Sequence, residues 1–132
     1  MSERRIARTL FYVAAIVNAA YGLLLLSMPE LLFDLSRDQG APQNHGWVRW
    51  SGGILVGMAF AALVATANPD KQRSLVLGFA AGYLFMALSL LYSLIAGEYQ
   101  GLYWVISLQI GVSAALALAM FWLLTKQARM ML

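Results

Sequence analysis

Residues 74–96 have the sequence SLVLGFAAGYLFMALSLLYSLIA, a run without a single charged side chain. An α-helix rises about 1.5 Å per residue, so this run would span about 35 Å, enough to cross a hydrocarbon core of about 30 Å. Three further apolar runs of similar length occupy residues 10–28, 47–67 and 102–124. Because backbone groups in lipid must be bonded internally, we expect an all-α fold, a four-transmembrane-helix bundle forming a single domain over residues 1–132.

The composition also indicates a membrane protein. Hydrophobic residues make up 61% of the chain and charged residues 11%, with a mean hydropathy of +0.70, whereas soluble domains are about 25% charged. The net charge of +3 would suit a nucleic-acid binder, but the basic residues lie in short flanks rather than on one continuous face, so no nucleic-acid partner is expected. The chain has no cysteine, which excludes disulfides and cysteine-ligated metals.

Lysine and arginine are distributed unequally between the two sides of the predicted spans. One side carries only Arg37 and Arg49, and the other carries Arg4, Arg5, Arg8, Lys71, Arg73, Lys126 and Arg129. The positive-inside rule therefore predicts a multi-pass protein of the cell inner (plasma) membrane with cytoplasmic N- and C-termini. The excess positive charge on the inner side also predicts an attraction to anionic lipid.

The connections between the spans differ in kind. Residues 68–71 and 97–101 have the composition of tight turns. Residues 27–30, Ser-Met-Pro-Glu, have Ser and Glu at capping-box spacing with Pro in the first turn, which predicts the start of a new helix. Residues 31–33 and 35 are apolar and lie beside the acidic Glu30 and Asp34, which makes the segment amphipathic. We therefore expect a short interfacial helix after the first span.

Small residues recur at a spacing of four within the predicted spans. Such GxxxG-type pairs let helix backbones approach closely in lipid. They predict either tight packing within one bundle or contacts between chains of a homo-oligomer, and the sequence leaves both open. The candidate helix-packing positions are Gly53, Gly57, Gly78, Gly82 and Gly111.

Six polar residues in the outer half of the predicted spans are the candidate ligand-binding residues. Polar groups in lipid are costly unless partnered, so we predict a polar cavity open to the outer leaflet that binds a lipid or quinone-like molecule. Arg49 is assigned to the same helix face as Gly52, Gly53 and Gly57 and is expected to point into the bundle at the cavity mouth. Alternatively, the polar groups only bond across helices and Arg49 contacts headgroups or Glu98. The six are Asn18, Tyr21, Arg49, Ser89, Tyr92 and Gln109.

No catalytic residue, metal site or cofactor is predicted, and an enzyme is not expected. The single histidine, His45, lies in a loop, and with Asp34, Asp38 and Glu98 it matches no metal or acid–base spacing. The role of these four residues stays open. An accessory subunit of a larger membrane complex, or a binder of an amphipathic small molecule, fits the polar pattern best. A small transporter or channel acting as an oligomer is the alternative.

Two stretches carry a resemblance to a known family. Residues 21–32, YGLLLLSMPELL, resemble the first hairpin of DoxX-like small bacterial membrane proteins, and residues 47–53, WVRWSGG, continue the likeness. The resemblance implies a four-helix bundle along nearly the whole chain, and in some relatives a role as an accessory subunit of quinone-linked oxidoreductases. It supplies no catalytic residues, and only Arg49 and Gly53 correspond to the family signature.

Overall fold

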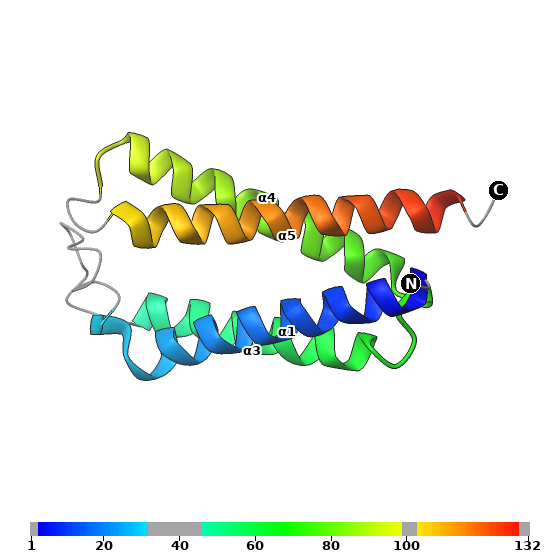
Figure 1. Ribbon diagram of the computed structural model, residues 1–132. Helices are drawn as coiled ribbons and strands as arrows, with labels where there is room; N and C mark the ends of the chain where they lie inside the picture. The colour runs from blue at the N-terminus through cyan, green and yellow to red at the C-terminus, as the bar shows by residue number, and fades with distance from the viewer. Residues whose placement is uncertain (1–2, 32–45, 99–102, 130–132) are drawn as a thin grey trace.

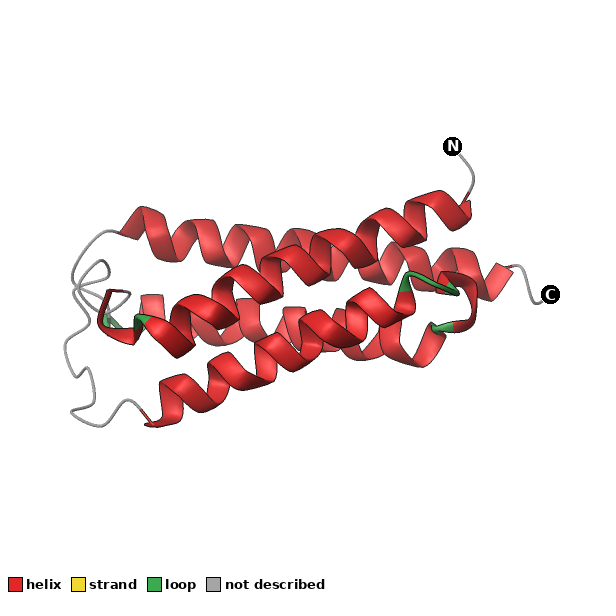
Figure 2. Cartoon of the chain, turned by 90° about the horizontal axis from the view of Figure 1, so that it is seen from below, coloured by secondary structure: helices red, strands yellow, loops and turns green. Residues whose placement is uncertain are grey.

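The computed structural model describes residues 3–31, 46–98 and 103–129 of the chain. Within this part the chain is helical and has no strand (Figure 2). Four helices are each long and apolar enough to cross a membrane, which confirms the predicted all-α four-helix fold. The elements are α1 (Glu3–Ser27), α3 (Gly46–Ala65), the short 3-10 helix η1 (Pro69–Lys71), α4 (Arg73–Ile95) and α5 (Tyr103–Arg129).

The helices form two layers, each an antiparallel pair (Figure 1). In one layer α1 packs against α3, and in the other α4 packs against α5. The start of α1, the turn between α3 and α4, and the end of α5 lie together at one end of the bundle, which we call the basic end. The end of α1 and the turn between α4 and α5 lie at the opposite end, called the remote end below.

Two helices extend beyond the apolar runs that predict them. α1 begins at Glu3, several residues before the run at residues 10–28, and α5 continues to Arg129, past the run at residues 102–124. The apolar run measures the thickness of the hydrocarbon core, whereas helical hydrogen bonding continues into the headgroup region. Both extensions project at the basic end.

The turns follow the predicted sequence signals. Pro69 begins η1, where the Lys71 amide donates to the Asn68 carbonyl over 3.2 Å. α4 ends just before Gly97, whose positive φ of 75° is a conformation that glycine adopts without strain. After α1 the chain becomes helical again at residues 29–31, as the Pro29 signal predicts. The rest of the predicted interfacial helix lies outside the described residues.

α1 and α3 approach each other most closely at two glycines. A methyl group added at Gly22 would lie 2.8 Å from the Gly52 carbonyl oxygen and 2.9 Å from the Val56 nitrogen. A methyl group at Gly52 would lie 2.8 Å from the Gly22 carbonyl oxygen. Because the obstructing atoms belong to the backbone, no side-chain movement can relieve the clash. The two helices are therefore in backbone contact, the geometry that small residues permit in membranes.

The glycines predicted to pack helices together within the bundle mostly do not. Four of them, Gly53, Gly57, Gly78 and Gly111, have open space where a Cβ would stand. Gly82 has only the flexible Met58 Cε nearby, at 3.8 Å. The prediction that these four glycines pack helices together within the bundle is thus wrong, because the helices contact each other through other faces. A contact between chains at these positions stays a prediction.

The largest buried side chains lie in the half of the bundle near the basic end. The Phe11 and Phe79 rings meet edge to face with centroids 6.2 Å apart, and Phe79 stacks on Tyr83 at 5.9 Å. Met120 and Val76 are also fully buried. This cluster joins α1, α4 and α5, and it reaches α3 through two buried alanines, Ala62 and Ala65. The two layers are therefore held together mainly at this end.

Replacing Gly22 by alanine is expected to destabilise the bundle, because the new methyl group meets backbone atoms of α3. Overpacking of this kind costs about 1–3 kcal/mol. Thermal unfolding in detergent measures the effect, and Gly53→Ala, next to Gly52 but facing open space, is the matched control. Equal stabilities of the two variants would contradict the backbone contact.

Candidate functional site

Asn18 is the most deeply buried of the six candidate ligand-binding residues, with 1% of its surface exposed. It lies on the face of α1 that also carries the buried Phe11, Ala14 and Gly22, as the 3,4 spacing of these positions predicts. The side chain therefore points into the bundle. Asn18 is nine residues from the end of α1 at Ser27, which places it about 14 Å from the remote end of that helix.

Tyr83, from α4 in the opposite layer, faces the Asn18 side chain. Its hydroxyl and the Asn18 Nδ2 are both fully buried, yet neither has a hydrogen-bond partner within the described part of the chain. The two groups are thus neighbours whose geometry falls short of a direct hydrogen bond. A buried polar atom without a partner costs about 1–3 kcal/mol, so this pair is the least satisfied polar feature of the core.

Ser113 of α5 adds a third polar side chain at the same depth and is 5% exposed. It lies ten residues after Tyr103, and Tyr83 lies twelve residues before Ile95. These counts correspond to about 15 Å and about 18 Å from the remote end, close to the middle of a bilayer. We call Asn18, Tyr83 and Ser113 the interior polar layer.

The bundle is less tightly filled between this layer and the remote end. Leu25 continues the buried face of α1, and Leu90 and Leu94 continue that of α4, but all three are only half-buried. Gln109, one turn from Ser113 on α5, is also half-buried. These side chains point inward but keep solvent-accessible surface, which indicates that the two helix pairs pack less closely in this part of the bundle. We call these four residues the half-buried stretch.

The remaining candidates occupy different places. Tyr21 is half-buried, like Gln109, and both lie on inward faces. Arg49, Ser89 and Tyr92 are exposed, Tyr92 by 71%. The prediction that these three face a common cavity is therefore wrong, because Arg49 and Ser89 lie on the same outward faces of α3 and α4 as the open glycines.

Tyr83 and Ser113 were not among the predicted site residues. A tyrosine within an apolar run is hard to distinguish from an ordinary hydrophobic residue, and a serine in a transmembrane helix commonly bonds its own backbone. What identifies them is their depth in the membrane, measured along each helix from the remote end. Counted from the remote ends of their helices, both fall at the level of Asn18.

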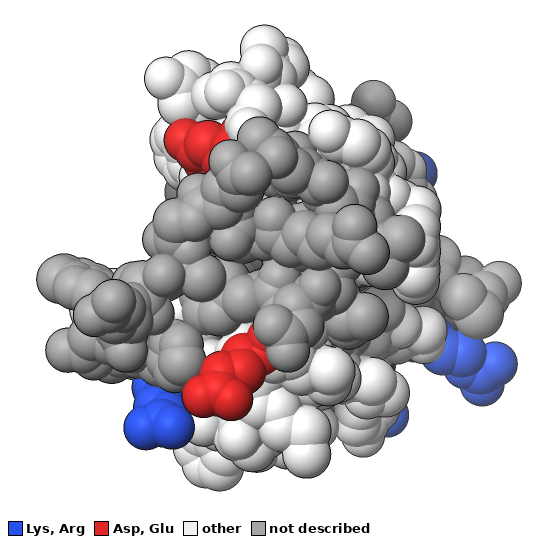
Figure 3. Space-filling view, turned by 90° about the vertical axis from the view of Figure 1, so that its left-hand side faces the viewer, with Lys and Arg blue, Asp and Glu red and all other residues white. Residues whose placement is uncertain are grey.

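The interior polar layer supplies hydrogen-bond donors without charge. An amide NH2 and two hydroxyls donate hydrogen bonds to a neutral acceptor such as a carbonyl oxygen. The buried residues described include no Asp, Glu, Lys, Arg or His. At the remote end acidic side chains are seen on the upper and lower sides of the face, and a basic side chain lies next to the lower one in this view (Figure 3). Glu98 is exposed there, and the predicted rim residues Asp34, Asp38 and His45 lie outside the described residues.

The fold and site together define a multi-pass membrane protein with a neutral polar layer inside a four-helix bundle. Comparison with models of known families, with curated proteins and with solved structures finds no match. The resemblance to DoxX-like proteins therefore has no support beyond the short stretches that carry it.

The double variant Asn18→Leu/Tyr83→Phe is expected to raise the free energy of unfolding of the delipidated protein by about 1 kcal/mol. The reason is that it removes two buried polar groups that lack partners. Chemical or thermal unfolding in detergent measures the change. Ser89→Ala, an exposed polar position on α4, is the control and should change stability by less than about 0.5 kcal/mol. A loss of stability in the double variant would contradict the expectation that the two groups lack partners.

Proposed function

We propose that this protein binds a neutral amphipathic small molecule inside its helical bundle. The proposal is carried by one observation: Asn18 Nδ2 and the Tyr83 hydroxyl are buried side by side without partners. Unpartnered buried donors are expensive. An acceptor on a bound molecule would satisfy both once the neighbouring half-buried side chains move apart to admit it. A carbonyl oxygen, as in a quinone-like or other uncharged lipid, is the matching group.

The surroundings of the polar layer support a particular orientation of the ligand. Toward the basic end the aromatic cluster fills the core, so the ligand has no room there. Toward the remote end the half-buried stretch offers mainly leucine side chains. The polar head would therefore lie on the interior polar layer and the apolar tail would extend toward the remote end. A charged phospholipid headgroup would not suit the layer, because no buried charge is described that could neutralise it.

The proposal covers both a binding protein that acts alone and an accessory subunit that holds such a molecule for a partner. A lone binding protein and an accessory subunit differ in what co-purifies with the protein after detergent extraction. Native mass spectrometry in mild detergent distinguishes them, because a subunit retains larger partners and a lone binder retains only the small molecule.

Extraction of the purified protein is expected to release a neutral amphiphile, detected by mass spectrometry. Asn18→Leu/Tyr83→Phe should reduce its amount at least about tenfold, since two hydrogen bonds of about 1 kcal/mol each are lost. Ser89→Ala should retain the wild-type amount because Ser89 is exposed on the outward face of α4. The same amphiphile in equal amount in all three proteins would refute the site.

We also propose that the basic end faces the cytoplasm, in a plasma membrane. The support is the concentration of Lys and Arg at this end, which the positive-inside rule assigns to the inner side.

The orientation is testable because the chain has no cysteine, so each introduced thiol is unique. Lys71→Cys lies in the turn at the basic end and Glu98→Cys in the turn at the remote end, and both positions are exposed. A membrane-impermeant maleimide added to intact cells should label Glu98→Cys and spare Lys71→Cys until the membrane is opened. The reverse pattern would overturn the orientation.

A further inference from the structure

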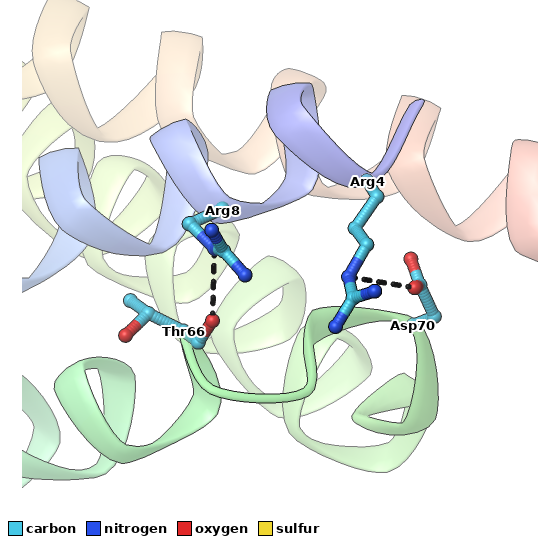
Figure 4. Close-up of polar contacts among 4 residues, drawn as sticks. All are labelled: Arg4, Arg8, Thr66 and Asp70. Atoms are coloured by element: carbon cyan, nitrogen blue, oxygen red, sulfur yellow. Dashed lines mark hydrogen bonds and ion pairs between the residues drawn. The ribbon is translucent and has the colours of Figure 1, made fainter. Parts of the chain in front are cut away.

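Two arginines of α1 extend over the turn between α3 and α4 (Figure 4). Arg8 Nε donates to the Thr66 carbonyl oxygen over 3.1 Å. Arg4 Nε lies 3.6 Å from Asp70 Oδ2, in an ion pair whose side chains are 57% and 46% exposed. Residues four apart on a helix are neighbours on one face. The two guanidinium groups are therefore directed to the same side of α1 and fixed against the same turn.

These contacts leave most of the donor capacity of both arginines unused. A guanidinium group carries five N–H donors, and the contacts described for Arg4 and Arg8 are made through Nε. The Nη groups are thus available to a further acceptor. Asp70 compensates only part of the positive charge, so the group formed by Arg4, Arg8 and Asp70 has a net charge of +1.

The position of the pair on α1 indicates where the acceptor comes from. The apolar run of the first span begins at residue 10, two residues after Arg8. Arg4 and Arg8 therefore lie at the depth of lipid phosphates at the basic end. Arginine pairs well with phosphate because two parallel N–H groups match two phosphate oxygens.

We propose that Arg4 and Arg8 form a site for the phosphodiester group of an anionic phospholipid. A phosphodiester has one negative charge, which matches the net charge of the site. Inorganic phosphate carries between one and two charges at neutral pH and lacks the acyl chains that would hold it beside α1. This site is distinct from the interior polar layer. Arg8 is ten residues from Asn18, about 15 Å along the helix.

The site is tested by native mass spectrometry of the full chain in an uncharged detergent, titrated with phosphatidylglycerol, phosphatidylcholine or inorganic phosphate. Phosphatidylglycerol should bind at least about tenfold more tightly than phosphatidylcholine. Arg4→Gln/Arg8→Gln should weaken phosphatidylglycerol binding about tenfold or more, because charge-assisted hydrogen bonds are lost. Binding of inorganic phosphate as tight as that of phosphatidylglycerol would overturn the assignment to a lipid.

Two further variants separate a built site from general attraction to a basic surface. Lys126→Gln removes one positive charge from α5 at the same end, where the ammonium lies 5.6 Å from the Trp122 ring centroid, and should change affinity less than about twofold. Asp70→Asn removes the competing carboxylate and should raise affinity, although it breaks an ion pair. An equal loss in Lys126→Gln, or no gain in Asp70→Asn, would overturn the proposal. A gain in Asp70→Asn together with an unchanged affinity in Lys126→Gln supports the site even if the double arginine variant fails to fold.

Discussion

In lipid, apolar surface gives helices little reason to associate, so close packing of their backbones has to hold them together. This protein meets the constraint at Gly22 and Gly52, where α1 and α3 approach until a single methyl group would meet backbone atoms. The contact fixes the rotation of α1 against α3. Asn18 lies one turn away on the same face of α1 and is carried into the interior as a result. Burial of the polar site thus follows from a contact between two glycines.

The two halves of the bundle differ in how completely they are filled. Near the basic end, Phe11, Phe79 and Tyr83 pack in sequence across the layers, and Arg4 and Arg8 tie α1 to the turn that follows α3. Beyond the polar layer the inward side chains are only half-buried. The closed half can therefore act as a rigid base, while the open half is the part of the bundle where a hydrophobic molecule would meet least resistance.

The sequence predicts the fold well, because the length of an apolar run and the thickness of a bilayer leave little choice. It predicts the inward face of α1 for a similar reason, since Phe11, Ala14 and Asn18 follow a regular spacing. The sequence does not predict the inward face of α3 correctly. Gly52 and Gly53 are adjacent in this helix, but they point about 100° apart. Only the first meets a partner helix. When a helix is apolar all round, spacing alone does not identify the buried face, and the glycine spacing of α3 therefore predicts an inward Arg49 that the structure places outward.

Charge and neutral polarity are separated along this molecule, and the separation limits what each region can bind. Every Lys and Arg described lies near a helix end or in a turn, whereas the polar layer near the membrane centre has only amide and hydroxyl groups. A charged ligand would lose its hydration at the layer without gaining a counter-ion. A neutral one loses less and gains hydrogen bonds. On the proposed functions, the layer would favour uncharged molecules and the arginines would favour anionic ones. About 15 Å of α1 separates the two sets of polar groups.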